Sequence, residues 1–320
     1  MARLKEYNCH YCESEYEYAF IGFLEAEGWK YSSGNNIHRV TKRDVLIADD
    51  FKKFIADTNP DLTEDEVTQI YDNVRLVGAE SDFATLHKVY GWMVNGVQFT
   101  PQDGLPRMIP LIDFDNWDKN IFHVVNQFTV EYTNNGQKEN RRPDVLLFVN
   151  GMPLCVVELK NPADANATIY DAWEQINIRY WRDIPHLLHY CPLACISDGV
   201  KTRLGTVRTP YEHFYAWRRV TEGDAVSTLP FAETETMIKG VYSPERFLEI
   251  FRDYIYFQDS IYDSDEREIV CRYPQFFAAR LLKHSIIKSV VEKSGKGGTY
   301  FGATGCGKTY TMAFLARQLA

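Results

Sequence analysis

The sequence predicts an α/β protein built around one central sheet, and three observations support this fold class. Segments with helical periodicity alternate with β-branched segments, in the order helix, strands, helix, strand. Asn150-Gly151 separates two hydrophobic runs, VLLFV and PLCVVELK, which is a strong hairpin signal. A glycine-rich stretch over residues 302–309 precedes a further helical segment.

Each element is predicted from its own local signal. Gly28 is a natural stop for the first helix, while Thr63 and Glu66 form a capping box at the second. Asp198-Gly199 marks the turn after the last strand. The predicted elements outside the hairpin are helices over residues 13–30, 62–74 and 164–184 and strands over residues 121–132 and 193–197.

Length and composition leave room for two domains and exclude several classes of protein. The chain has 320 residues, of which 45% are hydrophobic and 25% charged, so it can bury a full core. It has neither an apolar run approaching the roughly 18 residues of a membrane span nor a secretory signal, so we expect a cytoplasmic protein without membrane contact. The net charge of -9 disfavours a nonspecific nucleic-acid coat, although local basic clusters remain compatible with a DNA enzyme.

The seven cysteines argue against a disulfide framework, because their number is odd and their spacing is irregular. Cys9 and Cys12, with His10 between them, have the spacing of half a zinc site. No second ligand pair lies at suitable spacing in the sequence, so two ordinary thiols are the favoured interpretation.

Three charged residues, Asp144, Glu158 and Lys160, stand at the ends of the hydrophobic hairpin. A two-residue turn would place Glu158 on the face opposite Asp144, because strand side chains alternate. We therefore predict a three-residue loop over residues 150–152, with Gly151 at positive φ. In that register Asp144 faces Glu158, with Lys160 two residues further along.

Paired carboxylates at the end of a strand favour a divalent cation. Two ionised carboxylates with Cβ atoms roughly 5 Å apart repel each other, and a cation removes the repulsion. Mg²⁺ prefers one or two carboxylates, several waters and phosphate oxygens. Asp144 and Glu158 are thus predicted to hold Mg²⁺ for phosphodiester hydrolysis, with Lys160 orienting or deprotonating the attacking water. A buried ion pair between Lys160 and one acid is the structural alternative, but it leaves the second acid unexplained.

Pro143-Asp144, followed by Glu158-Leu159-Lys160, resembles the PD-(D/E)xK nuclease motif in the form found in the restriction (R) subunit of type I restriction-modification enzymes. The segments VVNQFTV, CISDG, LGTV, FYAWR and YPQFFAARLLKHSI are similar to that family in order and spacing, so the resemblance covers nearly the whole chain. It implies a restriction-endonuclease-like core over residues 1–240, with a central mixed sheet flanked by helices. It also implies Mg²⁺-dependent cleavage of unmodified double-stranded DNA after translocation, in a complex with specificity and modification (methyltransferase) subunits.

The resemblance implies two further site positions. An acid of the first helix reaches the metal in many related nucleases, and Glu17 is the matching candidate, although Glu13, Glu15 or a solvated role remain open. A Gln-x-x-x-Tyr motif is expected on the helix after the lysine, but here Gln175 and Tyr180 are one residue further apart. In an α-helix five residues rotate by about 140°, so these two side chains are predicted to lie on different faces. We favour Gln175 as the catalytic-site residue and place Tyr180 in the core.

Basic residues near these positions are candidates for DNA contact. Gln175, Arg179 and Arg182 form a polar stripe at helical spacing, suited to the rim of an active site or to a DNA phosphate. Arg142, next to the proline of the nuclease motif, is the third arginine in this group. Each of them, taken alone, is more typical of a solvated surface.

The glycine-rich stretch FGATGCGKT, residues 301–309, matches the Walker A motif in full. Its glycines let backbone N–H groups turn toward the phosphates of ATP, while Lys308 reaches the β and γ phosphates and Thr309 binds Mg²⁺. The flanks GGTYF and YTMAFLARQLA are predicted to be a short strand and a helix. Gln275 resembles the adenine-reading glutamine of superfamily 2 helicases. The predicted ATP-binding residues are Gln275, Gly302, Thr304, Gly305, Gly307, Lys308 and Thr309.

We therefore divide the chain into a nuclease domain over residues 1–240, a helical linker over 241–270 and the start of a RecA-like helicase domain over 271–320. ATP hydrolysis needs an acid from a later strand and an arginine from a second lobe, so we do not expect these residues alone to be an ATPase. The alternative is a helicase-type ATPase fragment whose inactive nuclease relic serves as a docking module for partner subunits.

Overall fold

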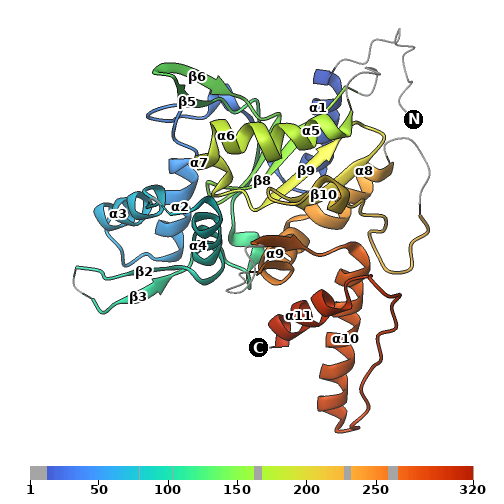
Figure 1. The fold of residues 1–320 in the computed structure, drawn as a ribbon. Helices are drawn as coiled ribbons and strands as arrows, with labels where there is room; N and C mark the ends of the chain where they lie inside the picture. The colour runs from blue at the N-terminus through green and yellow to red at the C-terminus, as the bar shows by residue number, and fades with distance from the viewer. Residues whose placement is uncertain are drawn as a thin grey trace, which may run out of the picture.

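A mixed six-stranded sheet forms the centre of the molecule in the computed structural model, which describes residues 13–78, 80–102, 104–161, 168–226, 232–258 and 266–319 (Figure 1). The strand order is β1-β4-β7-β8-β9-β10. The β1–β4 and β8–β9 pairs are parallel, and the other neighbours are antiparallel. The predicted α/β class is confirmed. The strands are Lys30–Ser33 (β1), Phe122–Asn126 (β4), Val145–Val149 (β7), Met152–Leu159 (β8), Leu193–Ser197 (β9) and Thr202–Thr206 (β10).

Helices flank this sheet and bury its two central strands. Every residue of β7 and β8 is buried, which is why both read as continuous hydrophobic runs in the sequence. In Figure 1, α5 and α6 lie across the front of the sheet, and α2, α3 and α4 form a group at its left end. The helices are Glu13–Ala26 (α1), Ala48–Thr58 (α2), Glu64–Arg75 (α3), Asp82–Asn95 (α4), Ile169–Glu174 (α5), Trp181–Asp183 (α6), Pro185–Leu188 (α7), Ala232–Met237 (α8) and Pro244–Asp253 (α9).

Several predicted element ends are confirmed by the structure. The first helix stops two residues before Gly28, which has a φ of 103°. The predicted capping box is present, because Glu66 N donates to Thr63 Oγ1 (3.3 Å) and Thr63 N donates to Glu66 Oε2 (2.8 Å). The strand predicted over residues 193–197 coincides with β9, and Gly199 has the positive φ of a turn glycine.

The single strand predicted over residues 121–132 is wrong, because the chain leaves the sheet in its middle. The backbone N of Gln127 still donates to Asp144 O (3.0 Å), the next position in the β4–β7 register, but the left-handed φ of 52° at Gln127 ends the strand. The second half becomes β5, Val130–Asn134, which pairs only with β6, Gln137–Arg141, in a separate two-stranded ribbon. β-branched composition marks both halves equally, so it could not reveal the break.

The turn of the β7–β8 hairpin also differs from the prediction. It has two residues, since Val149 pairs directly with Met152. Asn150 (φ 49°) and Gly151 (φ 76°) are both left-handed, as a type I′ turn requires, so the positive φ predicted for Gly151 is confirmed. A two-residue turn is favoured because its twist matches that of the flanking strands.

A bulge in β8 restores the predicted pairing of the two acids despite the shorter turn. Leu154 has no partner in β7, which shifts the register of the hairpin by one residue. Beyond this bulge Val145 pairs with Val157. Asp144 and Glu158 are the next residues outward on the two strands, so they come level with each other at the sheet edge.

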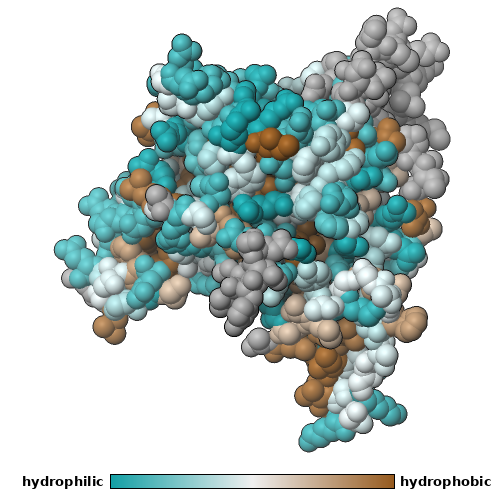
Figure 2. Space-filling model, in the orientation of Figure 1, coloured by the Kyte–Doolittle hydropathy of each residue, from teal (hydrophilic) through white to brown (hydrophobic). Residues whose placement is uncertain are grey.

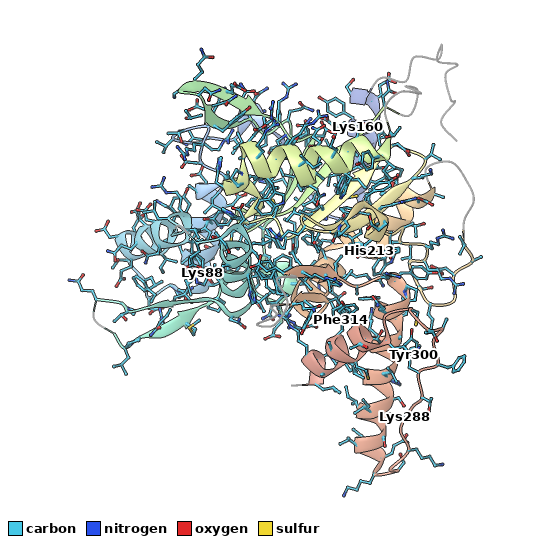
Figure 3. All side chains as sticks on the ribbon, viewed as in Figure 1. Lys88, Lys160, His213, Lys288, Tyr300 and Phe314 are labelled. Atoms are coloured by element: carbon cyan, nitrogen blue, oxygen red, sulfur yellow. The ribbon has the colours of Figure 1, made fainter. Side chains whose placement is uncertain are left out.

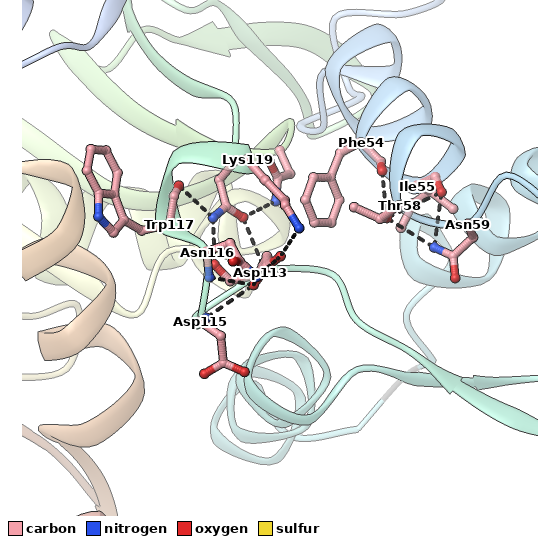
Figure 4. A network of polar contacts seen from close by, with 11 residues as sticks. Phe54, Ile55, Thr58, Asn59, Asp113, Asp115, Asn116, Trp117 and Lys119 are labelled. Atoms are coloured by element: carbon pink, nitrogen blue, oxygen red, sulfur yellow. Dashed lines mark hydrogen bonds and ion pairs between the residues drawn. The ribbon is translucent and has the colours of Figure 1, made fainter.

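The turn itself is fixed deep in the protein. Asn150 is fully buried, and its Nδ2 donates to Leu111 O (2.9 Å) and Asn120 Oδ1 (2.8 Å), while Ile121 N donates to its Oδ1 (2.8 Å). Asn120 belongs to a loop whose polar contacts gather around Asp113, as Figure 4 shows. The hairpin is thus anchored at the end opposite the acids.

The C-terminal part projects from the bottom of the molecule in Figure 1. Residues 297–301, predicted to be a strand, form none, because they lie beside no described strand with which to pair. The helix predicted after them is confirmed. No helix in the described ranges combines the length and apolar character that crossing a membrane requires. The remaining elements are the ribbon Val97–Phe99 (β2) and Arg107–Ile109 (β3), the ribbon Ile255–Gln258 (β11) and Arg267–Val270 (β12), and the helices Tyr273–Glu292 (α10) and Lys308–Leu319 (α11).

Candidate active site and glycine-rich loop

The structure brings Asp144, Glu158 and Lys160 together at the edge of the central sheet. Leu159 N donates to Asp144 Oδ2 (2.8 Å), and Asp144 N lies 3.4 Å from Glu158 Oε1. Glu158 is fully buried, whereas Asp144 keeps partial exposure. Lys160 follows the end of β8, where its backbone N donates to Ser197 O of the neighbouring strand (2.8 Å). The hairpin and β9 therefore fix the backbone that carries all three side chains.

Glu158 and Lys160 form a ring of polar contacts with two further side chains, Gln175 and Tyr180. Lys160 Nζ donates to Gln175 Oε1 (2.9 Å), and Gln175 Nε2 donates to Tyr180 OH (2.9 Å). Tyr180 OH in turn donates to Glu158 Oε1 (2.6 Å). Lys160 Nζ completes the ring at 3.9 Å from Glu158 Oε2. Figure 3 labels Lys160 at the upper edge of the molecule, near α5.

The prediction that Gln175 and Tyr180 lie on different faces is wrong. Residues Gln175–Tyr180 form a π-helical turn between α5 and α6, in which hydrogen bonds run from i to i+5. This wider turn brings residues five apart onto one side, so both side chains face Glu158. Tyr180 is buried, as predicted, but its hydroxyl belongs to the site.

Burial governs the protonation of the two acids. It raises the pKa of Glu158 well above its usual range, and the negative charge of Asp144 raises it further, whereas Lys160 and the Tyr180 hydroxyl oppose the rise. Burial also raises the pKa of Asp144, against the hydrogen bond from the Leu159 N–H. Without a cation, the acid pair therefore retains a proton at a pH where free carboxyls have lost theirs.

The donor set at this edge fits a magnesium ion. Glu158 Oε2 is buried without a hydrogen-bond partner, and Asp144 supplies a second carboxylate beside it. Two carboxylates with room for waters and phosphate oxygens are the ligands that Mg²⁺ prefers. Among the described residues, no group of three or more His, Cys, Asp or Glu side chains is placed to hold one ion.

Glu17 is turned inward from α1, whereas Glu15 is exposed. Its carboxylate accepts hydrogen bonds from Asn126 Nδ2 and Gln127 Nε2, both at 2.5 Å. Since Gln127 N also donates to Asp144 O (3.0 Å), Glu17 is linked to the site through one residue. That Glu17 ligates the metal stays a prediction. The cysteines of the predicted half zinc site, Cys9 and Cys12, lie outside the described residues.

The three predicted DNA-binding arginines occupy different surroundings. Arg142 is exposed and lies two residues before Asp144 in the chain. Arg179 donates to Glu174 Oε2 (2.9 Å) and remains half exposed. Arg182 is more exposed and donates to Asp183 (2.8 Å), further along α6.

A small open pocket of about 170 Å³ lies next to the ring of polar contacts. Its lining residues are Arg141, Gln175, Arg179 and Tyr180. Arg141, which sequence reasoning did not single out, donates to Asp183 Oδ2 (2.7 Å) and is held at the rim. It stands in the same basic pair as Arg142, but the sequence could not tell which of the two faces the site. For Tyr180 the available signal was the five-residue spacing, which suits a π turn.

The glycine-rich loop lies immediately before α11. Gly305 (φ 80°) and Gly307 (φ 81°) are left-handed, and α11 begins at Lys308. Lys308 Nζ donates to Gly302 O (2.9 Å) and Ala303 O (3.0 Å), so the lysine folds over the loop. A pocket of about 700 Å³ opens beside this loop. The residues lining it are Tyr256, Gln258, Thr304, Gly305, Gly307, Lys308, Thr309, Tyr310 and Ala313.

Gln275 lies under this loop and not in the lining of the pocket. Its Nε2 donates to Gly307 O (3.1 Å), and its Oε1 accepts from Arg272 N (2.8 Å) at the start of α10. The side chain is buried and joins the loop to α10. An adenine-reading role for Gln275 stays a prediction.

Comparison with known proteins adds the family. A family model described as type I restriction enzyme R protein N terminus matches residues 11–213. The chain is 30% identical over 331 residues to the MjaIXP type I restriction enzyme endonuclease subunit of Methanocaldococcus jannaschii, covering 94% of this chain and 31% of that protein. It is 29% identical over 324 residues to the HindI endonuclease subunit of Haemophilus influenzae, covering 96% of this chain and 30% of that protein. The chain spans less than a third of the length of these relatives. Since more than half of its residues match the family model, the chain belongs to the family of type I restriction enzyme R proteins, in their N-terminal region.

Proposed function

We propose that this chain carries the DNA-cleaving site of a type I restriction endonuclease subunit, in a PD-(D/E)xK nuclease domain over residues 1–240. The relatives are named as endonuclease subunits, which supports cleavage of DNA. One observation carries the proposal: Asp144, Glu158 and Lys160 meet in one cluster that includes a buried carboxylate oxygen without a hydrogen-bond partner.

In the proposed reaction each side chain of the cluster has a separate role. Asp144 and Glu158 would hold Mg²⁺, which when bound lowers the pKa of a water and stabilises negative charge on a phosphodiester. Tyr180 fixes the Glu158 carboxylate through its hydroxyl, and Gln175 fixes the Lys160 ammonium. Lys160 would then orient the attacking water as the ammonium or, as the neutral amine, take the proton of that water. A cation held there would favour the ionised form of both carboxyls.

The rim of the site offers contacts for double-stranded DNA. Arg141 and Arg179 line the small pocket beside the ring, and Arg142 lies two residues before Asp144 in the chain. Guanidinium groups suit the paired oxygens of a phosphate, and they would hold the DNA backbone next to the scissile bond. As sequence recognition in this family belongs to a specificity subunit, backbone contacts suffice here. We propose that the chain works with specificity and modification subunits.

The glycine-rich loop is proposed to bind ATP. The Walker A match, the left-handed Gly305 and Gly307 and the start of α11 at Lys308 support phosphate binding at a helix N-terminus. Residues 271–320 would then begin a RecA-like motor domain that translocates DNA, joined to the nuclease domain through residues 241–270. Hydrolysis of ATP needs groups beyond those of this loop.

Substitution of the cluster tests the nuclease proposal. In the complete restriction complex, Asp144→Ala and Lys160→Ala should each abolish Mg²⁺-dependent cleavage of DNA while ATP hydrolysis continues. The matched controls are Asp57→Ala and Lys53→Ala, which break an exposed ion pair on α2 (2.6 Å) and should cut at the normal rate. Wild-type cleavage by either cluster variant would refute the assignment.

Calorimetry separates an active site from a nuclease relic. The wild-type protein should bind Mg²⁺ with a heat signal that Asp144→Ala loses. If the two proteins give the same titration, the domain holds no cation at Asp144, and a docking role for partner subunits becomes the better explanation.

A further inference from the structure

A two-stranded ribbon, β5–β6, leaves the central sheet next to the acid pair. β5 and β6 pair with each other and with no other strand in the described ranges. The ribbon is inserted between β4 and β7, and its last residue, Arg141, lies three positions before Asp144. In Figure 1 the ribbon projects at the upper left of the molecule, beside α6. Its base is therefore fixed at the candidate active site, and its tip reaches outward.

The base of the ribbon is packed and hydrogen-bonded. Val130 is buried, and the Tyr132 hydroxyl donates to Glu139 Oε2 on the facing strand (2.6 Å). Arg141 lies over the Tyr132 ring, with its guanidinium carbon 5.4 Å from the ring centroid. The same guanidinium donates to Asp183 Oδ2 of α6 (2.7 Å). The ribbon is thus an arm whose position relative to the site is set at its base.

Two pockets that share Arg141 connect the site with the ribbon. Arg141 lines the pocket of about 170 Å³ together with Gln175 and Tyr180, and it also lines a second open pocket of about 440 Å³. The second pocket lies between the ribbon and α6, and its lining includes Asn134 of the ribbon and Arg182 of α6. A duplex bound over the acid pair would therefore meet the ribbon next.

The tip of the ribbon is exposed and polar. Residues 133–138 are all exposed, and no acid or large apolar side chain stands among them. They include three carboxamides, Asn134, Asn135 and Gln137, and one ammonium, Lys138. Carboxamide and ammonium groups hydrogen-bond the phosphates and the base edges of DNA. Protein-binding surfaces, by contrast, are centred on aromatic and other large side chains, so the tip suits DNA better than a partner subunit.

The acids near the base of the ribbon each have a partner. Glu131 lies 2.9 Å from the Lys138 ammonium, and Glu139 Oε1 accepts from Asn134 Nδ2 (2.9 Å). Asp183 is paired with both arginines that line the second pocket. These contacts leave no unpaired carboxylate on the ribbon to repel a phosphate backbone.

We propose that the β5–β6 ribbon enters the major groove of the double-stranded DNA that is cleaved at the acid pair. The inference rests on the proposed nuclease function. The major groove, about 12 Å wide and about 8.5 Å deep, admits a two-stranded ribbon. A strand of five residues spans roughly 17 Å, so the tip reaches the base edges while the base of the ribbon stays outside the duplex. The ribbon thereby holds the duplex in place over the acid pair.

Photo-cross-linking tests this contact in the complete restriction complex. p-Benzoylphenylalanine replaces Asn135 at the tip of the ribbon. In the control complex it replaces Leu105, which is 84% exposed between β2 and β3, at the lower left in Figure 1. Each complex is illuminated with labelled duplex DNA and ATP. We expect cross-links to DNA from position 135 and only background yield from position 105. Equal yields, or cross-links from position 135 to a partner subunit instead of DNA, would overturn the proposal.

Duplexes that contain uracil in place of thymine test which groove is occupied. The C5-methyl group of thymine lies in the major groove, and uracil lacks this group. Excited benzophenone inserts into C–H bonds, so cross-linking from position 135 should fall in the uracil duplex. An unchanged yield would overturn insertion into the major groove.

Removal of the amides tests the role of the ribbon in cleavage. The double variant Asn135→Gly with Gln137→Ala removes two carboxamides without changing the charge, and glycine accepts the left-handed φ of 49° at residue 135. DNA cleavage by the complete complex should fall about tenfold, whereas ATP hydrolysis should not change. The control, Leu105→Ala with Met108→Ala on the exposed β2–β3 ribbon, should cut at the wild-type rate.

Failure of this inference can be told apart from failure of the nuclease proposal. If Asp144→Ala cuts DNA at the wild-type rate, the acid pair is not the cleavage site. If Asp144→Ala abolishes cleavage while the double variant of the ribbon cuts normally, only the role of the ribbon is refuted.

Discussion

The hydroxyl of Tyr180 decides how the buried acid of the cluster is held. It donates to Glu158 Oε1 and accepts from Gln175, whose other end binds Lys160. A hydrogen bond to a charged group is worth more than one between neutral groups, because the charge would otherwise be buried without compensation. Tyr180 is therefore a positioning residue for both Glu158 and Lys160.

Tyr180→Phe should raise the Mg²⁺ concentration needed for half-maximal cleavage about tenfold. The hydroxyl lowers the pKa of Glu158, so its loss leaves the proton harder to displace by the cation. Raising the pH removes that proton, and the defect should therefore shrink as the pH rises. Cleavage is measured against Mg²⁺ concentration at each pH, with Tyr18→Phe as the control. A defect that does not depend on pH would indicate a purely structural role.

Glu268 on β12 is another buried acid, and its two carboxylate oxygens lack hydrogen-bond partners. Burial raises its pKa well above the usual range, with Thr206 and Arg208 opposing the rise. Below the pKa of the unfolded chain both states are protonated, and Glu268 has no effect on the pH dependence. As the pH rises above that value, the unfolded state loses its proton first, so stability falls.

Glu268→Gln should therefore raise the Tm at pH 8 by roughly 2–4 °C or more and change it little at pH 4. The amide carries no charge that burial could penalise. Glu25→Gln, at an exposed position of α1, serves as the control and should give the same small change at both pH values. Differential scanning calorimetry measures the shift. An equal Tm change for Glu268→Gln at both pH values would mean that burial of this carboxyl does not make stability fall as the pH rises.

At the scale of elements, the β7–β8 hairpin is the part that aligns the site. Hydrogen bonds of Asn150 hold the turn at one end of the hairpin, and Asp144 and Glu158 lie at the other end. Gly151 O accepts from Ile47 N (2.8 Å), so the turn packs directly on the start of α2. A Cβ on Gly151 would collide with Ile47 O and lie 2.9 Å from Phe51 N.

Gly151→Ala should thus lower the free energy of unfolding more than an alanine at a comparable turn glycine. Gly136, at the tip of the β5–β6 ribbon, has a similar φ of 79° and open space around its Cβ position. Gly136→Ala should cost about 1–2 kcal/mol from the left-handed backbone alone. Gly151→Ala should cost roughly 2 kcal/mol more, because the backbone of α2 must move. Urea denaturation of both variants gives the difference in their free energies of unfolding. Equal losses would mean that the backbone of α2 moves away from the new Cβ without an energetic cost.

At the scale of the whole molecule, the two candidate sites occupy separate ends. Lys160 lies at the upper edge in Figure 3, and Phe314 of α11 lies in the lower part. The β11–β12 ribbon connects them, since Thr206 Oγ1 of β10 donates to Glu268 O of β12 (3.2 Å) and Arg317 of α11 binds β11. Around α10 and α11, Figure 2 shows apolar surface, to which Leu281, Val290, Val291 and Met312 contribute.

This separation predicts independent binding. Lys308→Ala should abolish nucleotide binding without changing the Mg²⁺ titration at the acid pair, and Asp144→Ala should do the reverse. The double variant should show the sum of the two effects, because distant sites without shared partners are additive. Calorimetric titration of the wild type, the two single variants and the double variant forms a double-mutant cycle. A coupling energy above about 0.5 kcal/mol would show that the ribbon transmits binding between the sites.

The sequence predicted the α/β class and the capping box of α3, because each follows from a local pattern. It also predicted the meeting of Asp144 with Glu158, although from a turn length that the structure does not have. The hairpin departs from its prediction in two ways that compensate each other. The turn is one residue shorter than predicted, and Leu154 adds one residue as a bulge. The alternation of polar and apolar residues could reveal neither the turn length nor the bulge, because every residue of β8 is buried. A strand that is hydrophobic throughout carries no information about its register.

The other differences arise from contacts that sequence patterns do not encode. Gln127 breaks the predicted strand because its φ of 52° is left-handed, which ends the pairing of β4 with β7. Residues 297–301 have strand-like composition but no pairing partner among the described elements. The prediction that Tyr180 and Gln175 lie on different faces assumed an α-helix throughout. Residues Gln175–Tyr180 form a π-helical turn instead, which brings the two side chains onto one side.

The π turn has a consequence for how such enzymes are compared. One additional residue between a glutamine and a tyrosine looks like a broken motif when letters are counted. The widened turn takes up the insertion locally, so the two side chains keep their mutual hydrogen bond and the helix beyond resumes its path. An alignment that penalises the extra residue would misplace the tyrosine, whereas one that permits a gap within the helix would recover it.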